Sequence, residues 1–242
     1  MRFGLLGRDI DYSFSRSYFA EKFQKETLVH CTYENFDLPN LTQFETVLRT
    51  PQLKGMNVTI PYKQEVMPFL DGLDEVSQAI GAVNTIVFNK DGTTTGYNSD
   101  YIGFQKSIVP LITSQIKAAL VLGTGGSSKA VVYALHKMGI ATQYVSRKKG
   151  IDNLTYEEIT KRILKEHKLI VNCTPLGTHP NILQKPNLNY EQITNEHVLF
   201  DLIYNPTETA FMKAGRKAGA KAANGSNMLV EQAEASWRLW NM

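Results

Sequence analysis

The sequence has little of what marks several protein classes. Its two cysteines, Cys31 and Cys173, lie far apart in apolar, strand-like segments, which favours buried free thiols in a reducing compartment but leaves one disulfide open. No apolar run approaches the roughly 20 residues that a membrane-spanning helix needs. The apolar stretch near Met1 is too short for a signal peptide. These absences predict a soluble, cytoplasmic globular protein.

Charge of one sign is also scarce, because 26 Lys+Arg oppose 23 Asp+Glu among 242 residues, a formal charge of +3. That excess is too small to argue for a nucleic-acid partner. The five histidines show no ligand spacing such as His-x-x-x-His, so we expect no metal, and a metal hydrolase is the weakest interpretation. With 43% hydrophobic residues, the chain can bury a sizeable core in one large domain or two modest ones.

The arrangement of strands and helices changes near residue 103. In the first part, short apolar or β-branched runs bounded by breakers predict strands, and the Asp-Gly pair of Asn89-Lys90-Asp91-Gly92 favours a hairpin. Phe19 and Phe23, four residues apart, predict a helix over Ser17–Lys25. The expected strands are Arg2–Gly7, Leu28–Tyr33, Gly55–Ile60 and the hairpin pair Val83–Phe88 and Thr93–Tyr97.

From residue 118 onward strands and helices alternate regularly. This order implies right-handed crossovers and a parallel sheet covered on both faces, so about residues 103–225 are predicted to form a doubly wound nucleotide-binding domain in an α/β protein. The expected strands are Ala118–Leu122, Ala141–Val145, Leu169–Cys173, Val198–Ile203 and Ala220–Ala223. The expected helices are Ser127–Met138, Thr155 to about Lys165 (opened by a capping box), Thr207–Ala218 and Asn227–Trp240.

A glycine-rich loop, Gly123-Thr124-Gly125-Gly126-Ser127-Ser128, follows the first strand of this second part. Gly123 permits a tight turn, and Gly125 and Gly126 let the backbone approach a pyrophosphate at a helix N-terminus. Ser128 stands where the usual fingerprint has Gly or Ala, which weakens the motif. Its place between a strand and a helix nevertheless favours dinucleotide binding over a purely conformational role.

The next strand ends in Ser146-Arg147-Lys148-Lys149. An NAD-binding domain usually places an acid here for the ribose 2′-hydroxyl, whereas an arginine accommodates a 2′-phosphate by bidentate hydrogen bonds. Charge runs in loops are usually only solvated. The position at the carboxyl end of the strand favours NADP over NAD.

Four polar motifs in the first part are candidates for chemistry, although each also has a plain structural interpretation. In Asn57-Val58-Thr59-Ile60-Pro61-Tyr62-Lys63 the proline stops the strand and directs the lysine, but most lysines are surface residues. Asp100 suits a helix N-cap, and Asn84 in Gly81-Ala82-Val83-Asn84-Thr85 suits a turn. Ser13-Phe14-Ser15 could simply be a polar loop.

Together these motifs resemble the shikimate dehydrogenase family, and the resemblance covers essentially the whole chain. Asn57–Lys63 resembles the family's Asn-Val-Thr-x-Pro-x-Lys segment, and residues 96–100 resemble Gly-x-Asn-Thr-Asp. The resemblance implies that Lys63 is catalytic with Asp100 as its partner. It also implies substrate contacts by Thr59 and Asn84, and by Ser13 and Ser15 at the substrate carboxylate.

The second part carries further matches. Gly123–Ala130 is similar to Gly-Ala-Gly-Gly-Ala, Asn172–Gly177 to Asn-Ala-Thr-Pro-Leu-Gly, Asp201–Pro206 to Asp-x-x-Tyr-x-Pro and Asn227–Gln232 to a Met-Leu-x-x-Gln segment. The resemblance implies that Tyr204 and Gln232 contact substrate. The implied cofactor contacts are Gly123, Gly125, Gly126, Ser127, Ser146, Arg147, Thr174, Leu202 and Gly225.

The chain departs from the family pattern at several positions. Tyr12 and Arg16 stand where the family usually has His before the first serine and Pro after the second, which bears on the carboxylate end of the site. Ser99 replaces a threonine, Ser146 an asparagine and Thr178 a methionine.

The resemblance implies reversible reduction of 3-dehydroshikimate to shikimate with NADPH, a step toward chorismate and the aromatic amino acids. Such chemistry suits Lys63, since an ammonium can stabilise charge on the ketone oxygen and supply a proton. The implied architecture is a substrate-binding domain, residues 1–102 completed by helix 226–242, and a Rossmann-type NADP-binding domain, residues 103–225, with a cleft between them. Small-molecule partners and a monomer or homodimer are expected, without nucleic acid or membrane. An NAD-using quinate/shikimate dehydrogenase and a catalytically silent NADP-binding regulatory module are the alternatives.

Overall fold

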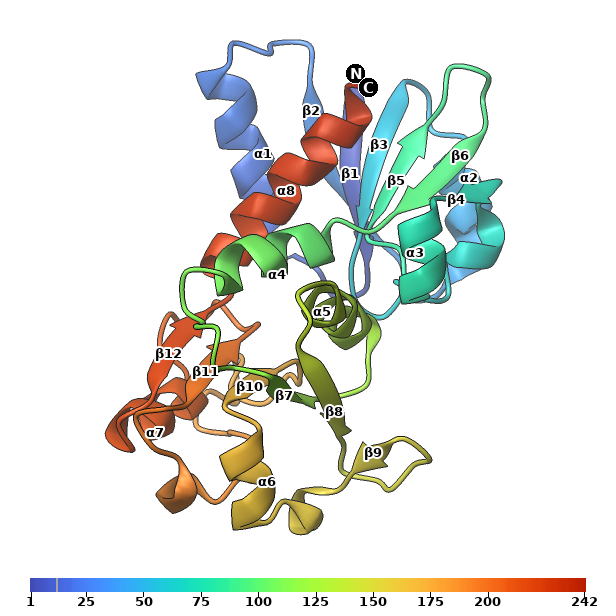
Figure 1. Ribbon diagram of the computed structural model, residues 1–242. Coiled ribbons are helices and arrows are strands. Elements are labelled where there is room, and N and C mark those ends of the chain that lie inside the picture. The colour runs from blue at the N-terminus through green and yellow to red at the C-terminus, as the bar shows by residue number, and fades with distance from the viewer. Residues whose placement is uncertain (12) are drawn as a thin grey trace. The chain divides into compact units, whose positions relative to one another are not determined.

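The chain folds into two compact units, described here for residues 1–11 and 13–242 of a computed structural model (Figure 1). Unit 1 comprises Met1–Asp100 and Gln232–Met242, and unit 2 comprises Tyr101–Glu231. The domain boundaries expected from the sequence, after residues 102 and 225, stay a prediction. Tyr12, one of the two departures at the expected carboxylate end, lies outside the described residues.

Unit 1 is built on a mixed six-stranded sheet with the order β2-β1-β3-β5-β6-β4. The strands β1 (Arg2–Gly7), β2 (Thr32–Asp37) and β3 (Leu53–Val58) run parallel, and β5 (Thr85–Phe88) runs antiparallel to β3. The expected hairpin is confirmed, because β5 pairs antiparallel with β6 (Thr94–Tyr97). The short strand β4 (Gly72–Leu73) pairs with β6 at the edge.

The second strand lies later in the chain than the sequence predicted. We expect a strand over Leu28–Tyr33, but the Leu28 N–H donates to the Phe23 carbonyl at 2.8 Å and the Cys31 N–H donates to the Leu28 carbonyl. These turns follow helix α1 (Phe14–Lys25), so β2 begins only at Thr32. The strand itself is largely polar (Thr-Tyr-Glu-Asn-Phe-Asp) because it lies at a sheet edge, so its hydrophobic pattern is weak.

Helices pack on both faces of this sheet, each against its own apolar cluster. In Figure 1, α1 and α8 (Ser226–Trp240) lie side by side over one face, where Phe3, Phe19 and Trp240 pack together. The indole of Trp240 covers Gly55, where an added Cβ would lie 2.2 Å from the ring. On the other face, α2 (Phe44–Leu48) adds its aromatic and aliphatic side chains to the second cluster. A short helix, α3 (Glu75–Ile80), begins at an Asp74 cap.

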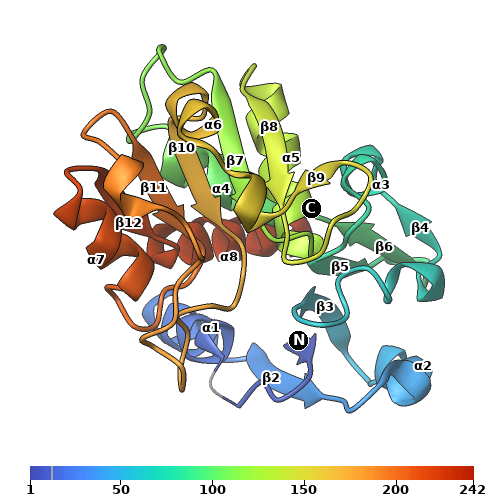
Figure 2. The ribbon, with the colours of Figure 1, turned by 90° about the horizontal axis from the view of Figure 1, so that it is seen from below.

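Unit 2 contains a six-stranded sheet in which every pairing is parallel. The order β12-β11-β10-β7-β8-β9 is the strand order of the doubly wound dinucleotide-binding fold, and Figure 2 shows most of these strands side by side. The strands are β7 (Ala118–Leu122), β8 (Ala141–Val145), β9 (Asn153–Leu154), β10 (Leu169–Asn172), β11 (Val198–Asp201) and β12 (Lys221–Asn224). The helices are α4 (Asp100–Ile108), α5 (Gly126–Lys137), α6 (Lys161–Glu166) and α7 (Ala210–Lys217).

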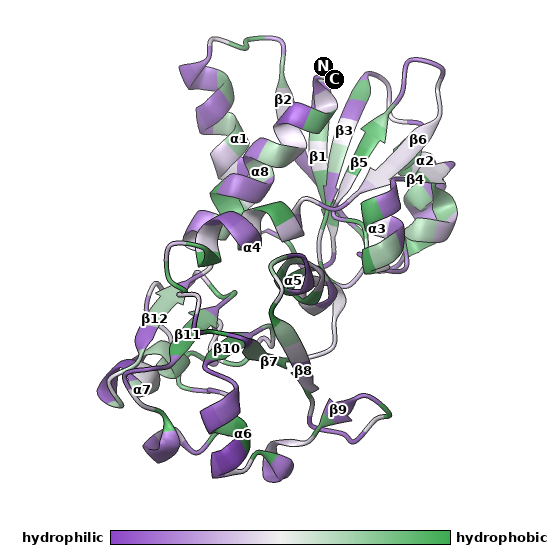
Figure 3. Ribbon diagram, viewed as in Figure 1, coloured by the Kyte–Doolittle hydropathy of each residue, from purple (hydrophilic) through white to green (hydrophobic). Residues whose placement is uncertain are grey.

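The central strands of unit 2 are buried on both faces, which is why they read as continuous apolar runs. Along β7, Ala119 and Val121 face a cluster with residues of α4 and α5, while Leu120 and Leu122 face a cluster with residues of α6 and α7. The same alternation continues through β10 and β11. Figure 3 shows this hydrophobic colouring on β7, and on β5 in unit 1. Two-sided burial confirms the parallel, doubly wound fold expected from the sequence.

The helix expected from Thr155 to about Lys165 is broken in two. The predicted capping box at Thr155 is present, but it closes only a 3₁₀ turn over Tyr156–Glu158. Ile159 then adopts an extended conformation with ψ 97°, and Thr160 caps the separate helix α6 by accepting from the Ile163 N–H. Thr155 and Thr160, both with extended backbone, therefore each cap a separate short helical segment, and no continuous helix forms.

The described ranges bear on membrane spans, metal clusters and the two cysteines. No helix there is long and apolar enough to span a membrane, and no three His, Cys, Asp or Glu side chains gather where they could hold a metal ion. Both cysteines are free, so the disulfide left open by the sequence does not form. The thiols are half-buried rather than buried as expected.

Candidate functional site

An ion pair joins the loop after β3 to the start of α4. The Lys63 ammonium lies 2.7 Å from Asp100 Oδ2, and the two side chains are only 12% and 3% exposed. The loop is held on both sides of Lys63: the Tyr62 hydroxyl donates to the Leu38 carbonyl, and the Lys63 carbonyl accepts from the Val83 N–H at 2.7 Å. The anchored backbone therefore gives the lysine a defined direction.

Both oxygens of the Asp100 carboxylate accept hydrogen bonds from side chains. One oxygen accepts from Lys63, and the other accepts from Asn84 Nδ2 at 2.9 Å. The Asp100 N–H at the start of α4 donates to the Asn98 side chain. The Asp100 carboxylate therefore does not cap its own helix, and its two oxygens bind Lys63 and Asn84.

Asn84 is the centre of the polar group around this pair. Its Nδ2 also donates to Gln232 Oε1 of α8 at 2.9 Å, and its Oδ1 accepts from the Ser99 N–H at 2.6 Å. Asn84 is 1% exposed. Unit 1 thus brings together Lys63, Asp100, Asn84 and Gln232, four of the residues singled out by sequence, although Gln232 lies 148 positions after Asn84.

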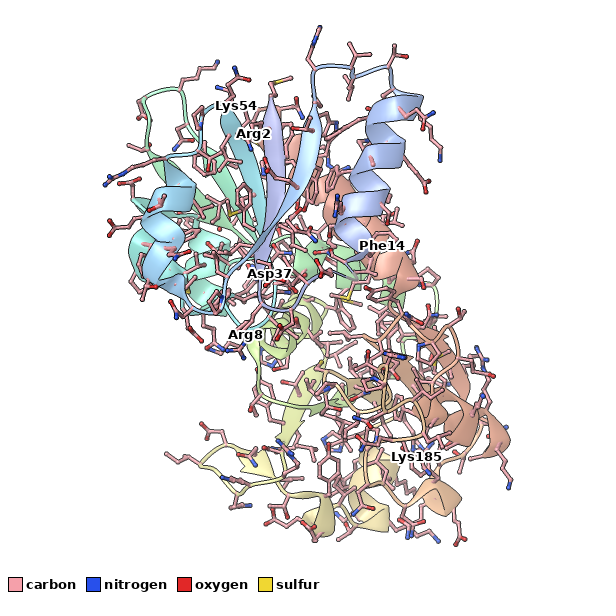
Figure 4. The ribbon with its side chains drawn as sticks, turned by 180° about the vertical axis from the view of Figure 1, so that it is seen from behind. Arg2, Arg8, Phe14, Asp37, Lys54 and Lys185 are labelled. Atoms are coloured by element: carbon pink, nitrogen blue, oxygen red, sulfur yellow. The ribbon has the colours of Figure 1, made fainter. Side chains whose placement is uncertain are left out.

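The two serines and Thr59 follow strands that are neighbours in the sheet. Ser13 caps α1 by accepting from the Ser15 N–H at 3.2 Å, and Thr59 follows β3, where its N–H donates to the Leu6 carbonyl. A Cβ on Gly7, the last residue of β1, would lie 2.6 Å from the Thr59 methyl. In Figure 4, Arg8 and Asp37 mark this carboxyl edge of the sheet, and Arg2 and Lys54 mark the opposite edge.

Arg16, the described departure at this end, is exposed on the first turn of α1. The loop before that helix is fixed by Asp37, whose two carboxylate oxygens accept from the Asp9 and Ile10 N–H groups at 2.9 and 3.0 Å. The loop that leads to Ser13, the N-cap of α1, and to Ser15 in its first turn is therefore held from β2.

The glycine loop of unit 2 lies between β7 and α5 as expected. Gly123 adopts φ +103°, a backbone conformation that favours glycine, and an added Cβ would meet the Cys173 carbonyl group at 3.3 Å. Gly125 occupies the N-cap of α5 and offers no side chain to its N–H groups. Ser128, which weakens the fingerprint in sequence, is buried and donates to the Gly125 carbonyl at 2.7 Å, so its hydroxyl is satisfied within the loop.

Two basic residues of the segment after β8, Arg147 and Lys149, differ in their contacts. Lys149 forms an ion pair with Glu158 at 2.7 Å, whereas Arg147 is exposed and pairs with no carboxylate of the described residues. The Ser146 N–H donates to the Leu154 carbonyl, which fixes the start of the segment. An uncapped helix N-terminus after a glycine turn, with an unpaired guanidinium at the end of the next strand, fits a dinucleotide that carries a 2′-phosphate.

A buried carboxylate organises the carboxyl ends of β10 and β11. Asp201 accepts from Asn172 Nδ2, the Ile203 N–H and the Thr209 hydroxyl at 2.9, 3.1 and 2.6 Å. Asn172 Oδ1 in turn accepts from both the N–H and the hydroxyl of Thr174. Thr174 and the segment Asp201–Ile203 are therefore connected through one polar cluster.

The remaining expected residues of unit 2 follow the same strand ends. Leu202 donates its N–H to the Asn172 carbonyl at 3.0 Å, and the buried Gly225 donates to the Ile203 carbonyl at 3.3 Å. Ser127 lies in the first turn of α5, and Tyr204 follows β11, half-buried. These positions share the carboxyl edge of the parallel sheet, where ligands of doubly wound folds bind.

Sequence reasoning missed several polar residues packed behind the Lys63–Asp100 pair. They are Asn57, Thr85, Ser99 and Ser236, all of them buried. Ser and Thr in a strand or helix give no pattern that distinguishes a hydrogen-bonded cluster from ordinary polarity. Ser236 lies 151 positions from its partner Thr85, so only the fold brings them together.

Known proteins resemble the chain over nearly its full length. A family model described as the shikimate dehydrogenase substrate binding domain matches residues 5–86. A shikimate dehydrogenase (NADP(+)) of Caldanaerobacter subterraneus subsp. tengcongensis is 36% identical over 258 residues, covering 98% of this chain and 90% of that protein.

Solved structures agree with this similarity. The crystal structure of shikimate dehydrogenase from Aquifex aeolicus has a TM-score of 0.88 and 32% identity, covering 100% of this chain and 92% of the other. Quinate dehydrogenase from Corynebacterium glutamicum, in complex with NAD, has a TM-score of 0.87 and 26% identity, covering 99% and 93%.

Burial of Asp201 predicts a measurable dependence of stability on pH. Burial raises the pKa of its carboxyl to about 6, although three hydrogen bonds oppose the shift. The folded chain then binds this proton more tightly than the unfolded chain, whose carboxyl titrates near 4. The contribution of Asp201 to the free energy of unfolding therefore falls as the pH rises from about 4 to about 6.

The non-titrating variant Asp201→Asn isolates this effect. Urea unfolding of both proteins between pH 4 and pH 7 should show the wild type losing roughly 2–3 kcal/mol relative to the variant. Stability curves that stay parallel across this range would show that Asp201 does not titrate as its burial requires.

Proposed function

The chain belongs to the shikimate dehydrogenase family, and on that premise we propose that it catalyses the reversible, NADPH-dependent reduction of 3-dehydroshikimate to shikimate. The observation that carries the proposal is the nearly buried Lys63–Asp100 pair with Asn84 and Gln232 around it. A lysine with no role beyond solubility is usually exposed, whereas Lys63 is nearly buried against a carboxylate. The arrangement holds an ammonium donor beside polar groups that suit a polyhydroxylated ring.

Lys63 acts on the ketone oxygen in this proposal. Hydride delivery to the carbonyl carbon places negative charge on that oxygen, and an ammonium in a water-poor site both stabilises the charge and supplies the proton. The bound NADPH supplies the hydride. Asp100 orients the ammonium through its 2.7 Å contact and accepts from a neighbouring ring hydroxyl.

Hydroxyl and amide groups hold the rest of the substrate. Ser13 and Ser15 donate to its carboxylate, which can only accept hydrogen bonds, and Tyr204 contributes a further contact. Thr59, Asn84 and Gln232 bind ring hydroxyls. The placement of the two serines and Thr59 at one edge of the unit 1 sheet supports this assignment.

The cofactor binds through unit 2 in this proposal. The loop residues Gly123, Gly125, Gly126 and Ser127 hold the pyrophosphate at the N-terminus of α5, and Ser146 with Arg147 holds the 2′-phosphate. Thr174, Leu202 and Gly225 complete the set near the nicotinamide. Residues 1–102 with 226–242 then serve as the substrate-binding domain and residues 103–225 as the NADP-binding domain.

A cytoplasmic location, the absence of nucleic-acid and membrane partners, and a monomeric or homodimeric state stay predictions from the sequence. The reaction itself is tested with purified protein, by following the absorbance of reduced nicotinamide with 3-dehydroshikimate and NADPH. Turnover with these two compounds is expected. A protein that binds NADP but shows no turnover would instead be the regulatory module considered from the sequence.

Removal of the Lys63 ammonium should abolish most of the catalysis. Lys63→Ala is expected to lower kcat by roughly 10²-fold or more with little change in the KM for shikimate, because the ammonium acts mainly on charge that develops in the transition state. Steady-state kinetics measures both constants. Lys54→Ala is the matched control, since Lys54 is an exposed lysine near the start of β3, at the opposite sheet edge. Near-normal turnover of Lys63→Ala would remove Lys63 from the mechanism.

The cofactor preference should depend on Arg147. Arg147→Ala is expected to lower the ratio of kcat/KM for NADPH to kcat/KM for NADH by about 10- to 100-fold, because it removes a charge-assisted contact with the 2′-phosphate. Lys149→Ala removes the same charge from the same loop, but Lys149 is paired with Glu158, so its ratio should change little.

Equal losses in both variants would mean that only the general charge of the loop matters. Oxidation of quinate and of shikimate, each with NAD⁺ and with NADP⁺, addresses the remaining alternative. A wild-type enzyme that prefers NAD⁺ and quinate would be the NAD-using quinate/shikimate dehydrogenase.

A further inference from the structure

Three hydroxyl groups form a closed triangle behind Asn84. Thr85 on β5, Ser99 before α4 and Ser236 on α8 are each 0% exposed. The oxygen of Thr85 lies 2.8 Å from that of Ser236 and 3.2 Å from that of Ser99, and the Ser99 and Ser236 oxygens lie 3.1 Å apart. Buried hydroxyls are costly unless they are satisfied, so the protons in this triangle must follow a consistent order.

The order starts from two main-chain carbonyls, which can only accept. Ser236 donates to the Gln232 carbonyl at 3.0 Å, which uses its single proton. Its oxygen therefore accepts from Thr85 and from Asn57 Nδ2, which lies 2.8 Å away. Asn57 Nδ2 also donates to the Asn84 carbonyl at 3.2 Å, which fixes the orientation of the Asn57 amide.

The opposite end of the Asn57 amide extends the network to Tyr33 on β2. With Nδ2 toward Asn84, Oδ1 faces the Tyr33 hydroxyl and accepts from it at 2.8 Å. Tyr33 is held in turn by stacking on Phe19, with ring centroids 4.6 Å apart. A continuous set of hydrogen bonds thus leads from Tyr33 through Asn57 to Ser236.

The other limb ends on the ion pair. Because the Thr85 proton goes to Ser236, the Thr85 oxygen accepts from the Ser99 hydroxyl at 3.2 Å, while the Ser99 N–H donates to Asn84 Oδ1 at 2.6 Å. These contacts fix the amide plane of Asn84, whose Nδ2 then holds Asp100 and Gln232. A rotation of this one amide would displace both partners, including the carboxylate that orients Lys63.

We propose that Ser236 and Tyr33 are positioning residues for the reaction: Ser236, through Thr85 and Ser99, sets the amide of Asn84 and so the Asp100–Lys63 pair, and Tyr33 fixes the Asn57 amide that donates to Ser236. Neither side chain contacts the reacting atoms. The inference rests on the proposed function, since it assigns what supports the ion pair of that substrate site. It explains why two buried hydroxyls on α8 and β2, far apart in sequence, belong to one network.

Both residues should affect kcat more than KM. Ser236→Ala is expected to lower kcat by roughly tenfold with a smaller change in KM, because the loss of one anchoring hydrogen bond disturbs the ion pair. Tyr33→Phe is expected to lower kcat by roughly fivefold, because Tyr33 acts on the same pair through Asn57. Ser236→Thr keeps the hydroxyl and should recover most of the lost kcat.

Matched variants separate positioning from simple loss of stability. Ser77→Ala removes another hydroxyl that is 0% exposed in unit 1, bonded to the Gly96 carbonyl at 2.8 Å and outside the network. Tyr18→Phe removes a hydroxyl that donates to Glu234 on α8. Both should keep kcat and KM within about twofold of wild type, even where thermal unfolding shifts as much as in the test variants.

The kinetic constants, measured together with the thermal midpoint of each variant, decide the proposal. Ser236→Ala and Tyr33→Phe that behave like their controls would overturn it, and so would a kcat loss in Ser236→Ala that Ser236→Thr fails to recover. If Ser236→Ala does not fold, the kcat of Tyr33→Phe against Tyr18→Phe decides alone. A wild-type protein without turnover would instead contradict the proposed function, which distinguishes the two failures.

Discussion

The ion pair between Lys63 and Asp100 is the interaction on which the rest of unit 1 depends. Two charged side chains at 12% and 3% exposure lose most of their hydration, and their mutual attraction offsets that loss only with good geometry and further hydrogen bonds. The second oxygen of Asp100 is accordingly satisfied by Asn84. The loops, strands and helix around the pair supply this geometry, and the same polar environment can bind a ring with several hydroxyls.

Unit 2 also collects its polar groups at one place in the fold. Its parallel sheet gathers the glycine turn, the basic segment and the Asp201 cluster at the carboxyl ends of its strands. The N-terminus of α5 has no side-chain cap at Gly125, so its N–H groups suit an anion. Asp201 differs from Asp100 because the donors that hold it within the described part of the chain are neutral: Asn172, Thr209 and the Ile203 N–H. Burial therefore raises its pKa to about 6.

The sequence predicts unit 2 better than unit 1, for a physical reason. Strands such as Ala118–Leu122 are buried on both faces and flanked by helices, so their apolar runs are unambiguous. The polar edge strand Thr32–Asp37 gives no such signal, and α2, with five residues, is too short to show a helical period. The break at Ile159 depends on a second cap at Thr160, which local patterns favour no more than a continuous helix.

The candidate site divides in the same way. Motif resemblance finds Lys63, Asp100, Asn84 and Gln232 because their types and order form a family pattern, and unit 1 brings them together. The same sequence gives no hint of Ser236 or Tyr33, since their roles depend on partners far along the chain: Asn57 lies 179 positions from Ser236 and 24 from Tyr33. Only the three-dimensional arrangement specifies a buried polar network of this kind.

In the proposed mechanism, the carboxylate of Asp100 keeps the Lys63 ammonium in its reactive orientation. The kcat of Asp100→Asn with shikimate and NADP⁺ tests this role, since the substitution keeps the shape of the side chain and removes its charge. We expect kcat to fall by roughly 10²-fold, with unchanged binding of NADP⁺. Turnover within about twofold of the wild type would contradict it.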